Sequence, residues 1–241
     1  MLGGGVWAGY RWLTTSPRFA ITAITIQGTH RVAADELRAA LPIRIGDNVF
    51  EGLAPVARAV RANPWIAGAS VHRILPHTIA IEVREHTAAA IALLGEPYLA
   101  DDSGHPFKRA ALETGEGDGL PIITGISRAS YAANPEAAAA TVRSAIAAAG
   151  RWRTAARPAI GEIHVDPHGA MTLHTYDPAI AIQLGAIATP QTPQTLYAGL
   201  DARMHTFDTA WAGLSDAERA RTRAIHVDAR LDHVTVAFAK D

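Results

Sequence analysis

The segment from Asn63 to His86 restricts the possible folds more than any other part of the sequence. It reads NPWIAGASVHRILPHTIAIEVREH, and its first proline ends any preceding helix, because the residue before a proline is pushed out of the α region. Residues 79–84 alternate aliphatic with small or charged side chains, which is typical of a half-buried strand. Residues 69–75 indicate a second strand, and the LPH between the two is short enough for a hairpin connection.

One strand and two helices are expected before this hairpin. FAITAITIQG, residues 19–28, is rich in β-branched side chains, and a change of apolar phase after Ile21 indicates a bulge or a late start. Helical spacing follows in AADELRAALP and in LAPVARAVRANP, each of which ends at a proline. The order β-α-α-β-β predicts a compact domain over residues 16–87, with two helices covering a small sheet.

Residues 88–241 show a second pattern, in which short strands and turns alternate with helices. The helix NPEAAAATVRSAIAAAG begins with a typical Asn-Pro pair and is expected to end at Gly150. A Thr-Pro pair begins the longest expected helix, and Ser215 with Glu218 predicts a capping box for a short helix after it. We therefore expect an α+β protein whose second domain is a mixed, mainly antiparallel sheet with flanking helices. The stripe of the longest helix comprises Leu196, Leu200, Met204, Phe207, Trp211 and Leu214.

Charge and composition exclude several partners and chemistries. The 241 residues include 22 basic and 23 acidic side chains, a formal charge of -1, so no electrostatic pattern favours nucleic acid. The chain has no cysteine, which excludes disulfide bonds, thiolate catalysis and cysteine zinc sites. This composition also fits an oxidising compartment.

The first residues leave two alternatives open. Residues 1–13, MLGGGVWAGYRWL, are apolar with aromatic side chains at Trp7, Tyr10 and Trp12. They are shorter than the roughly 20 residues that cross a bilayer. They are either the end of a membrane helix that begins upstream or a frayed apolar tail.

Catalytic chemistry has little support in the sequence. His164, Asp166 and His168 could serve a periplasmic metal-dependent hydrolase, but their spacing belongs to a strand that runs into an Asp-Pro-x-Gly turn. The DDSG at 101–104 is likewise explained by turn formation. Nucleophile-elbow, phosphate-loop and zinc-protease motifs are missing. A non-catalytic protein is therefore favoured.

The last strand offers a possible binding surface. In HVTVAF, residues 233–238, Val234 and Val236 share one face and His233, Thr235 and Ala237 the other. A terminal strand often lies at a sheet edge, where free backbone N–H and C=O groups can pair with a strand of another chain. An ordinary terminal strand without a partner is the alternative.

A resemblance to a known family adds to these observations. PWIAGASVHRILPHTIAIEVREH resembles the signature of the FtsQ/DivIB family of bacterial cell-division proteins. Downstream, YLADDSGHPFK, LPIITG, MTLHTYDPAIAIQLG and IHVDARLDHVTVAF resemble later family segments in the family's order. The resemblance covers nearly all of residues 19–238. The signature residues are Pro64, Trp65, Ile66, Ala69, Val71, Arg73, Leu75, Pro76, Ile81, Val83 and Glu85.

The resemblance implies a scaffold with two domains outside the cytoplasm. Residues 16–87 would form a POTRA domain, and residues 88–241 the family's β domain with a partner-binding C-terminal strand. Residues 1–15 would be the end of a single inner-membrane helix. Such a protein lies at the division septum, mostly in the periplasm, and binds FtsB and FtsL without catalysis, cofactor, metal, nucleic acid or small-molecule substrate. A POTRA-bearing translocation or chaperone component is an alternative, although it would need tandem POTRA domains or a following barrel.

The resemblance also implies which residues bind the partner. Carried over by position, they are Arg230, Leu231, His233, Thr235 and Phe238. Leu231 stands where the family usually has an aromatic residue, and Phe238 where it commonly has tryptophan. We expect that Phe238→Ala, or a proline at Thr235, weakens partner binding and leaves the fold intact.

Overall fold

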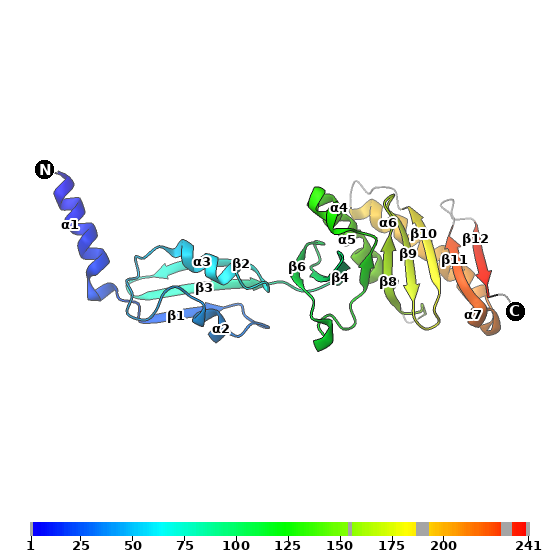
Figure 1. The fold of residues 1–241 in the computed structure, drawn as a ribbon, viewed down its shortest axis with the longest axis horizontal. Helices are drawn as coiled ribbons and strands as arrows, with labels where there is room; N and C mark the ends of the chain where they lie inside the picture. Colours follow the sequence, from blue (N-terminus) through cyan, green and yellow to red (C-terminus); the bar gives the residue numbers. More distant parts are fainter. Residues whose placement is uncertain (1, 154–155, 187–192, 228–232, 240–241) are drawn as a thin grey trace. The chain divides into compact units, whose positions relative to one another are not determined.

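The computed structural model describes residues 2–153, 156–186, 193–227 and 233–239 (Figure 1). The chain divides into two compact units, Met1–His86 and Thr87–Asp241. The first unit opens with helix α1 (Leu2–Thr15) and a short 3-10 turn, η1 (Pro17–Phe19). Among the helices in these ranges, none is both long and apolar enough to cross a membrane.

The first unit has the expected β-α-α-β-β order. Its sheet has the strand order β1-β3-β2, with β1 parallel and β2 antiparallel to the central strand. The late start of the first strand is confirmed, because Ala20 makes only an isolated bridge to Asn48 and the strand begins at Ala23. The elements are β1 (Ala23–Gln27), α2 (Ala34–Ala39), α3 (Leu53–Arg61), β2 (Ile66–Ile74) and β3 (Thr78–Glu85).

The core of this unit lies between the sheet and its two helices. Ile79 and Ile81 of β3 are buried, as are Leu37 of α2 and Val56 of α3, and each such burial contributes about 1.5–3 kcal/mol. Trp65, just before β2, is also buried.

The signature residues hold the loops around this core. Arg73 donates from Nε to the Val49 carbonyl and from Nη2 to the Glu51 carbonyl, both at 2.7 Å, which fixes the chain ahead of α3. Pro64 lies after the end of α3, and Pro76 forms a cis peptide with Leu75 in the β2–β3 turn.

The second unit is built on one sheet of nine strands in the order β12-β11-β10-β9-β8-β7-β4-β5-β6. Five of the eight strand pairings are antiparallel and three are parallel, so the expected mixed, mainly antiparallel α+β fold is confirmed. The strands are β4 (Ala90–Leu93), β5 (Pro97–Ala100), β6 (Pro106–Arg109), β7 (Ile122–Thr124), β8 (Ile160–Val165), β9 (Ala170–Thr175), β10 (Ala181–Ala186), β11 (Thr222–Val227) and β12 (Val234–Phe238).

Two long helices, α5 (Pro135–Trp152) and α6 (Pro193–Gly213), pack together on one face of this sheet (Figure 1). The expected stripe of α6 is confirmed at Leu200, Met204 and Phe207, which are buried against the strands. Its last expected member, Leu214, lies after the helix end at Gly213. The remaining elements are η2 (Leu112–Thr114), α4 (Arg128–Ala133) and α7 (Asp216–Arg221).

Helices α4, α5 and α7 begin at side-chain caps, and one helix end differs from the sequence expectation. The capping box at Ser215 and Glu218 is present. The expected helix end at Gly150 is wrong, because α5 continues for two residues to Trp152. The Trp152 side chain is buried and its Nε1–H donates to the Pro158 carbonyl at 2.8 Å, so packing extends the helix past the glycine.

The turn between β5 and β6 is pressed against α5. Gly104 has φ +85°, and an added Cβ there would lie 2.1 Å from the Ala139 carbonyl oxygen. Arg143 Nη1 donates to the Ser103 carbonyl at 3.0 Å and holds the same turn. Only glycine fits this close backbone approach.

We predict that Gly104→Ala is strongly destabilising. The left-handed backbone alone costs an alanine about 1 kcal/mol, and the collision with α5 adds about 2 kcal/mol. Gly169→Ala is the matched control, because φ is +80° there but no atom lies within 4 Å of the added Cβ. Urea denaturation measures both, and equal losses in free energy of unfolding would contradict the tight contact.

The Glu85 carboxylate, at the end of β3, holds the loop between β1 and α2. It accepts backbone N–H bonds from His30, Arg31 and Val32 at 2.9–3.0 Å, and the Arg31 guanidinium lies 3.9 Å from the centre of the Trp65 ring. Partial desolvation raises the pKa of Glu85, but the three N–H donors together outweigh it, so the pKa lies below its ordinary value. The ionised carboxylate therefore stabilises the fold.

Glu85→Gln is expected to lower the free energy of unfolding by about 1–2 kcal/mol near neutral pH. Because the folded pKa is lowered, this stabilisation is present above the unfolded value, about 4.3, and is lost as the pH falls through the folded one. The difference between wild type and variant should shrink in acid. Glu82→Gln is the control, since Glu82 is exposed; a pH-independent Glu85→Gln effect would refute this role.

Candidate docking edge of the second unit

Strand β12 is the last strand of the nine-stranded sheet. Within the described chain, β11 is its one strand neighbour, and the pairing is antiparallel. The strand reads VTVAF, with neither charge nor proline. Its outer side thus has the chemistry of an open edge.

The opposite edge, β6, carries features that discourage strand addition. It has four residues, begins at Pro106 and contains Lys108 and Arg109. Lys108 pairs with Glu116 and Arg109 with Glu96, both at 2.6 Å. Short length, proline and charge are the usual protections of an edge, so β12 is the better candidate for pairing.

The direction of the β12 backbone groups follows from one hydrogen bond. The Ala239 N–H donates to the Arg221 carbonyl at 2.8 Å, which directs that residue's backbone toward β11. The register shift in this pair adds a residue to β11 between Thr222 and Ala224 and none to β12. The direction therefore keeps alternating along β12, and the N–H groups of Thr235 and Ala237 also point toward β11. The N–H groups of Val234, Val236 and Phe238 then point outward.

This alternation corrects the expectation for Thr235. A proline at Thr235 would remove a bond to β11, where Thr235 lies opposite His226, and would disturb the sheet itself. The outward N–H nearest the middle of β12 belongs to Val236.

The side chains of β12 fall on two faces. Val234 and Val236 pack against the core, whereas His233, Thr235 and Ala237 are exposed on the other side. Phe238 has 43% of its surface exposed, which leaves much of its ring free for a partner. Of the residues implied by the family resemblance, Arg230 and Leu231 lie outside the described residues.

A polar row crosses the helix-free face and ends at β12, and sequence reasoning missed it. Thr124 Oγ1 lies 2.9 Å from His164 Nδ1, and His226 Nδ1 lies 2.9 Å from Gln183 Oε1. Such cross-strand pairs help to fix the register. The period-two spacing of polar residues along each strand was the available signal. Successive strand partners in the row are Thr124, His164, Thr172, Gln183, His226 and Thr235.

The structure does not gather the suspected metal ligands. Asp166 Oδ1 accepts the N–H groups of His168 and Ala170 at 2.7 and 2.9 Å, which is turn geometry. Among the residues described, no group of three His, Cys, Asp or Glu could hold a metal ion. In the DDSG turn, Ser103 Oγ lies 2.9 Å from His105 Nδ1, and Asp101 Oδ1 accepts the backbone N–H groups of both residues.

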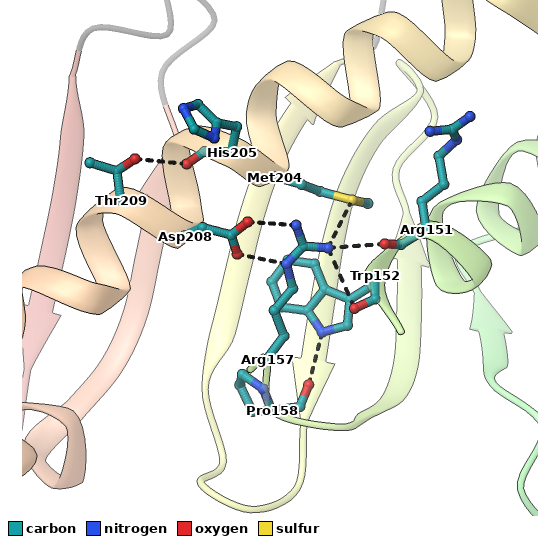
Figure 2. A network of polar contacts seen from close by, with 8 residues as sticks. All are labelled: Arg151, Trp152, Arg157, Pro158, Met204, His205, Asp208 and Thr209. Atoms are coloured by element: carbon teal, nitrogen blue, oxygen red, sulfur yellow. Dashed lines mark hydrogen bonds and ion pairs between the residues drawn. The ribbon is translucent and has the colours of Figure 1, made fainter. Parts of the chain in front are cut away.

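An arginine whose side chain is only 10% exposed joins the two helices that cover the sheet (Figure 2). Arg157 is bidentate to Asp208 of α6, with both N–O distances 2.7 Å, and its Nη1 donates to the Arg151 carbonyl of α5 at 2.9 Å. The adjacent Trp152 and Phe207 rings lie 4.7 Å apart. The contacts fix α6, which packs on β11 and β12.

Comparisons with known proteins agree on one family. Residues 19–86 match the family model of the POTRA domain, FtsQ-type. The chain is 35% identical over 233 residues to the cell division protein FtsQ of Anaeromyxobacter sp. (strain K), a match that covers 95% of this chain and 74% of that protein.

Two further relatives are matched over less of their length. The cell division protein FtsQ of Myxococcus fulvus is 38% identical over 151 residues, which covers 61% of this chain and 52% of the relative. That of Syntrophotalea carbinolica is 31% identical over 177 residues, which covers 72% of this chain and 62% of the relative.

The Arg157 network yields a prediction about stability. Arg157→Lys should lower the free energy of unfolding by about 1–2 kcal/mol, because lysine cannot keep the bidentate geometry and the Arg157 side chain is only 10% exposed, although Asp208 is 42% exposed. Arg109→Lys is the control, because the Arg109–Glu96 pair is exposed and should contribute less than about 1 kcal/mol. Thermal or urea unfolding measures both; equal effects would show that the network does not hold α6.

Proposed function

Because this chain belongs to the FtsQ family of cell division proteins, we propose that it is a non-catalytic scaffold that adds a partner's strand to its own sheet at β12. Membership of the family supports the role in cell division. The mode of binding is our inference from the edge described above.

The observation that carries the proposal is the uncharged outer edge of β12. Val234, Val236 and Phe238 direct their N–H groups away from β11 by strand alternation. A strand that pairs there gains backbone hydrogen bonds for affinity and alternate side-chain contacts for specificity.

Magnitudes indicate that backbone pairing needs side-chain contacts to bind well. The bonds of three outward residues contribute about 0.5–1.5 kcal/mol each, whereas association costs about 4–15 kcal/mol. Full burial of a completely exposed phenylalanine contributes about 1.5–3 kcal/mol, and because Phe238 has less than half of its surface left to bury, it would contribute roughly 1 kcal/mol. Phe238, with 43% of its surface exposed, is therefore proposed as a main side-chain contact.

The proposed partner is the FtsB/FtsL pair, as the family resemblance implies. With it goes the proposed location: the bacterial division septum, with the bulk of the chain in the periplasm and α1 as the end of a single inner-membrane helix. Residues 16–87 and 88–241 would then be the POTRA and partner-binding domains. Arg230, Leu231, His233 and Thr235 are proposed to complete the contact around Phe238.

We predict that Val236→Pro lowers the affinity for an FtsB segment by about tenfold or more. The variant removes an outward N–H and places a proline ring in the path of the added strand. Val236→Ala keeps the N–H and is the matched control for lost packing. Calorimetry measures binding.

Phe238→Ala should weaken binding of the same FtsB segment, because less apolar surface is buried in the complex. Circular dichroism should show that the Val236→Pro and Phe238→Ala variants both remain folded. If Val236→Pro binds as well as Val236→Ala, strand addition at β12 is wrong.

A further inference from the structure

The exposed apolar side chains of the first unit gather at one end. In the part of this unit that the structure describes, six large apolar residues are exposed by 55–68%. Three lie on α1, one lies before α3, and two lie at the β2–β3 turn. They are Trp7, Tyr10, Trp12, Ile45, Ile74 and Leu75.

Contacts at the end of α1 join it to the sheet domain. The Trp12 and Phe19 rings lie edge to face at 5.8 Å, and Phe19 meets Phe50 at 5.0 Å. Asn48 Nδ2 donates to the Leu13 carbonyl at 3.0 Å. The last turn of α1 and the chain before α3 therefore lie together.

The chain before α3 and the β2–β3 turn lie on either side of the segment that follows α1. On one side, Ile21 exchanges backbone hydrogen bonds with Gly46 and Asp47, next to Ile45. On the other side, the Thr22 N–H donates to the His77 carbonyl at 2.9 Å. Ile45 and the turn at Ile74–Leu75 thus lie at the α1 end of the domain.

Charge at this end matches an anionic surface. Four arginines and two carboxylates lie within residues 7–22, 43–51 and 73–78, so this end is locally positive. The whole chain, in contrast, carries a formal charge of -1. Tryptophan, tyrosine and arginine are the residues that favour the membrane–water interface. Exposed aliphatic side chains beside them add apolar contact with the acyl boundary.

We propose that this end of the first unit, defined by Ile45, Ile74, Leu75 and the exposed face of α1, binds the surface of an anionic lipid bilayer. The turn at Ile74–Leu75 inserts at headgroup depth, so the domain itself contacts lipid in addition to α1. The proposal goes beyond the docking edge at β12 and does not depend on it.

A single label tests insertion directly. The chain has no cysteine, so Leu75→Cys in the full chain gives one site for an NBD fluorophore. With vesicles of phosphatidylglycerol and phosphatidylcholine, we expect quenching by nitroxide-labelled lipid. Leu112→Cys, an exposed site in the second unit, is the control and should stay unquenched. Two results would overturn the proposal. In one, the protein floats with the vesicles but the label at residue 75 is not quenched; in the other, the protein does not float with them.

A second experiment measures the contribution to affinity. Ile74→Ser with Leu75→Ser should weaken vesicle binding by about tenfold, because two exposed aliphatic side chains no longer enter the lipid. Vesicles of phosphatidylcholine alone should bind the wild type more weakly. Circular dichroism checks that the double variant is folded. If the double variant binds the vesicles as tightly as the wild type, the turn does not have the proposed role.

Discussion

The outer backbone groups of β12, which no strand of the described chain pairs, are the constraint on which the proposed function depends. Every strand has polar backbone groups on both sides, and an open sheet must leave two edges unpaired by its own strands. In this sheet, β6 is short, begins with Pro106 and carries two basic residues, whereas β12 is uncharged. Within the described chain, the sheet is therefore protected at the β6 edge and has the chemistry of an open edge at β12.

The interior of the second unit holds that edge in place before any partner arrives. Arg157 and Asp208 join the α5 end to α6 (Figure 2), and Trp152 packs on Phe207. Helix α6 in turn packs on β11 and β12. Because a strand that is already ordered loses little conformational entropy on binding, this packing favours strand addition.

Local features could be predicted from the sequence, and long-range ones could not. The Ser215–Glu218 capping box and the stripe of α6 depend on neighbours within a few turns, and both are present. Helix α5 passes Gly150 because Trp152 finds its contacts far along the chain. Likewise, the outward direction of Val236 depends on pairing between β11 and β12, which no local pattern reveals.

Hydrogen exchange of individual β12 amides, followed by NMR with and without an FtsB segment, tests the central claim most directly. The N–H groups of Val234, Val236 and Phe238 should exchange more slowly in the complex, because they pair with the added strand. Those of Thr235 and Ala237, already directed toward β11, should change little. Partner binding that leaves exchange at Val236 unchanged would contradict strand addition at this edge.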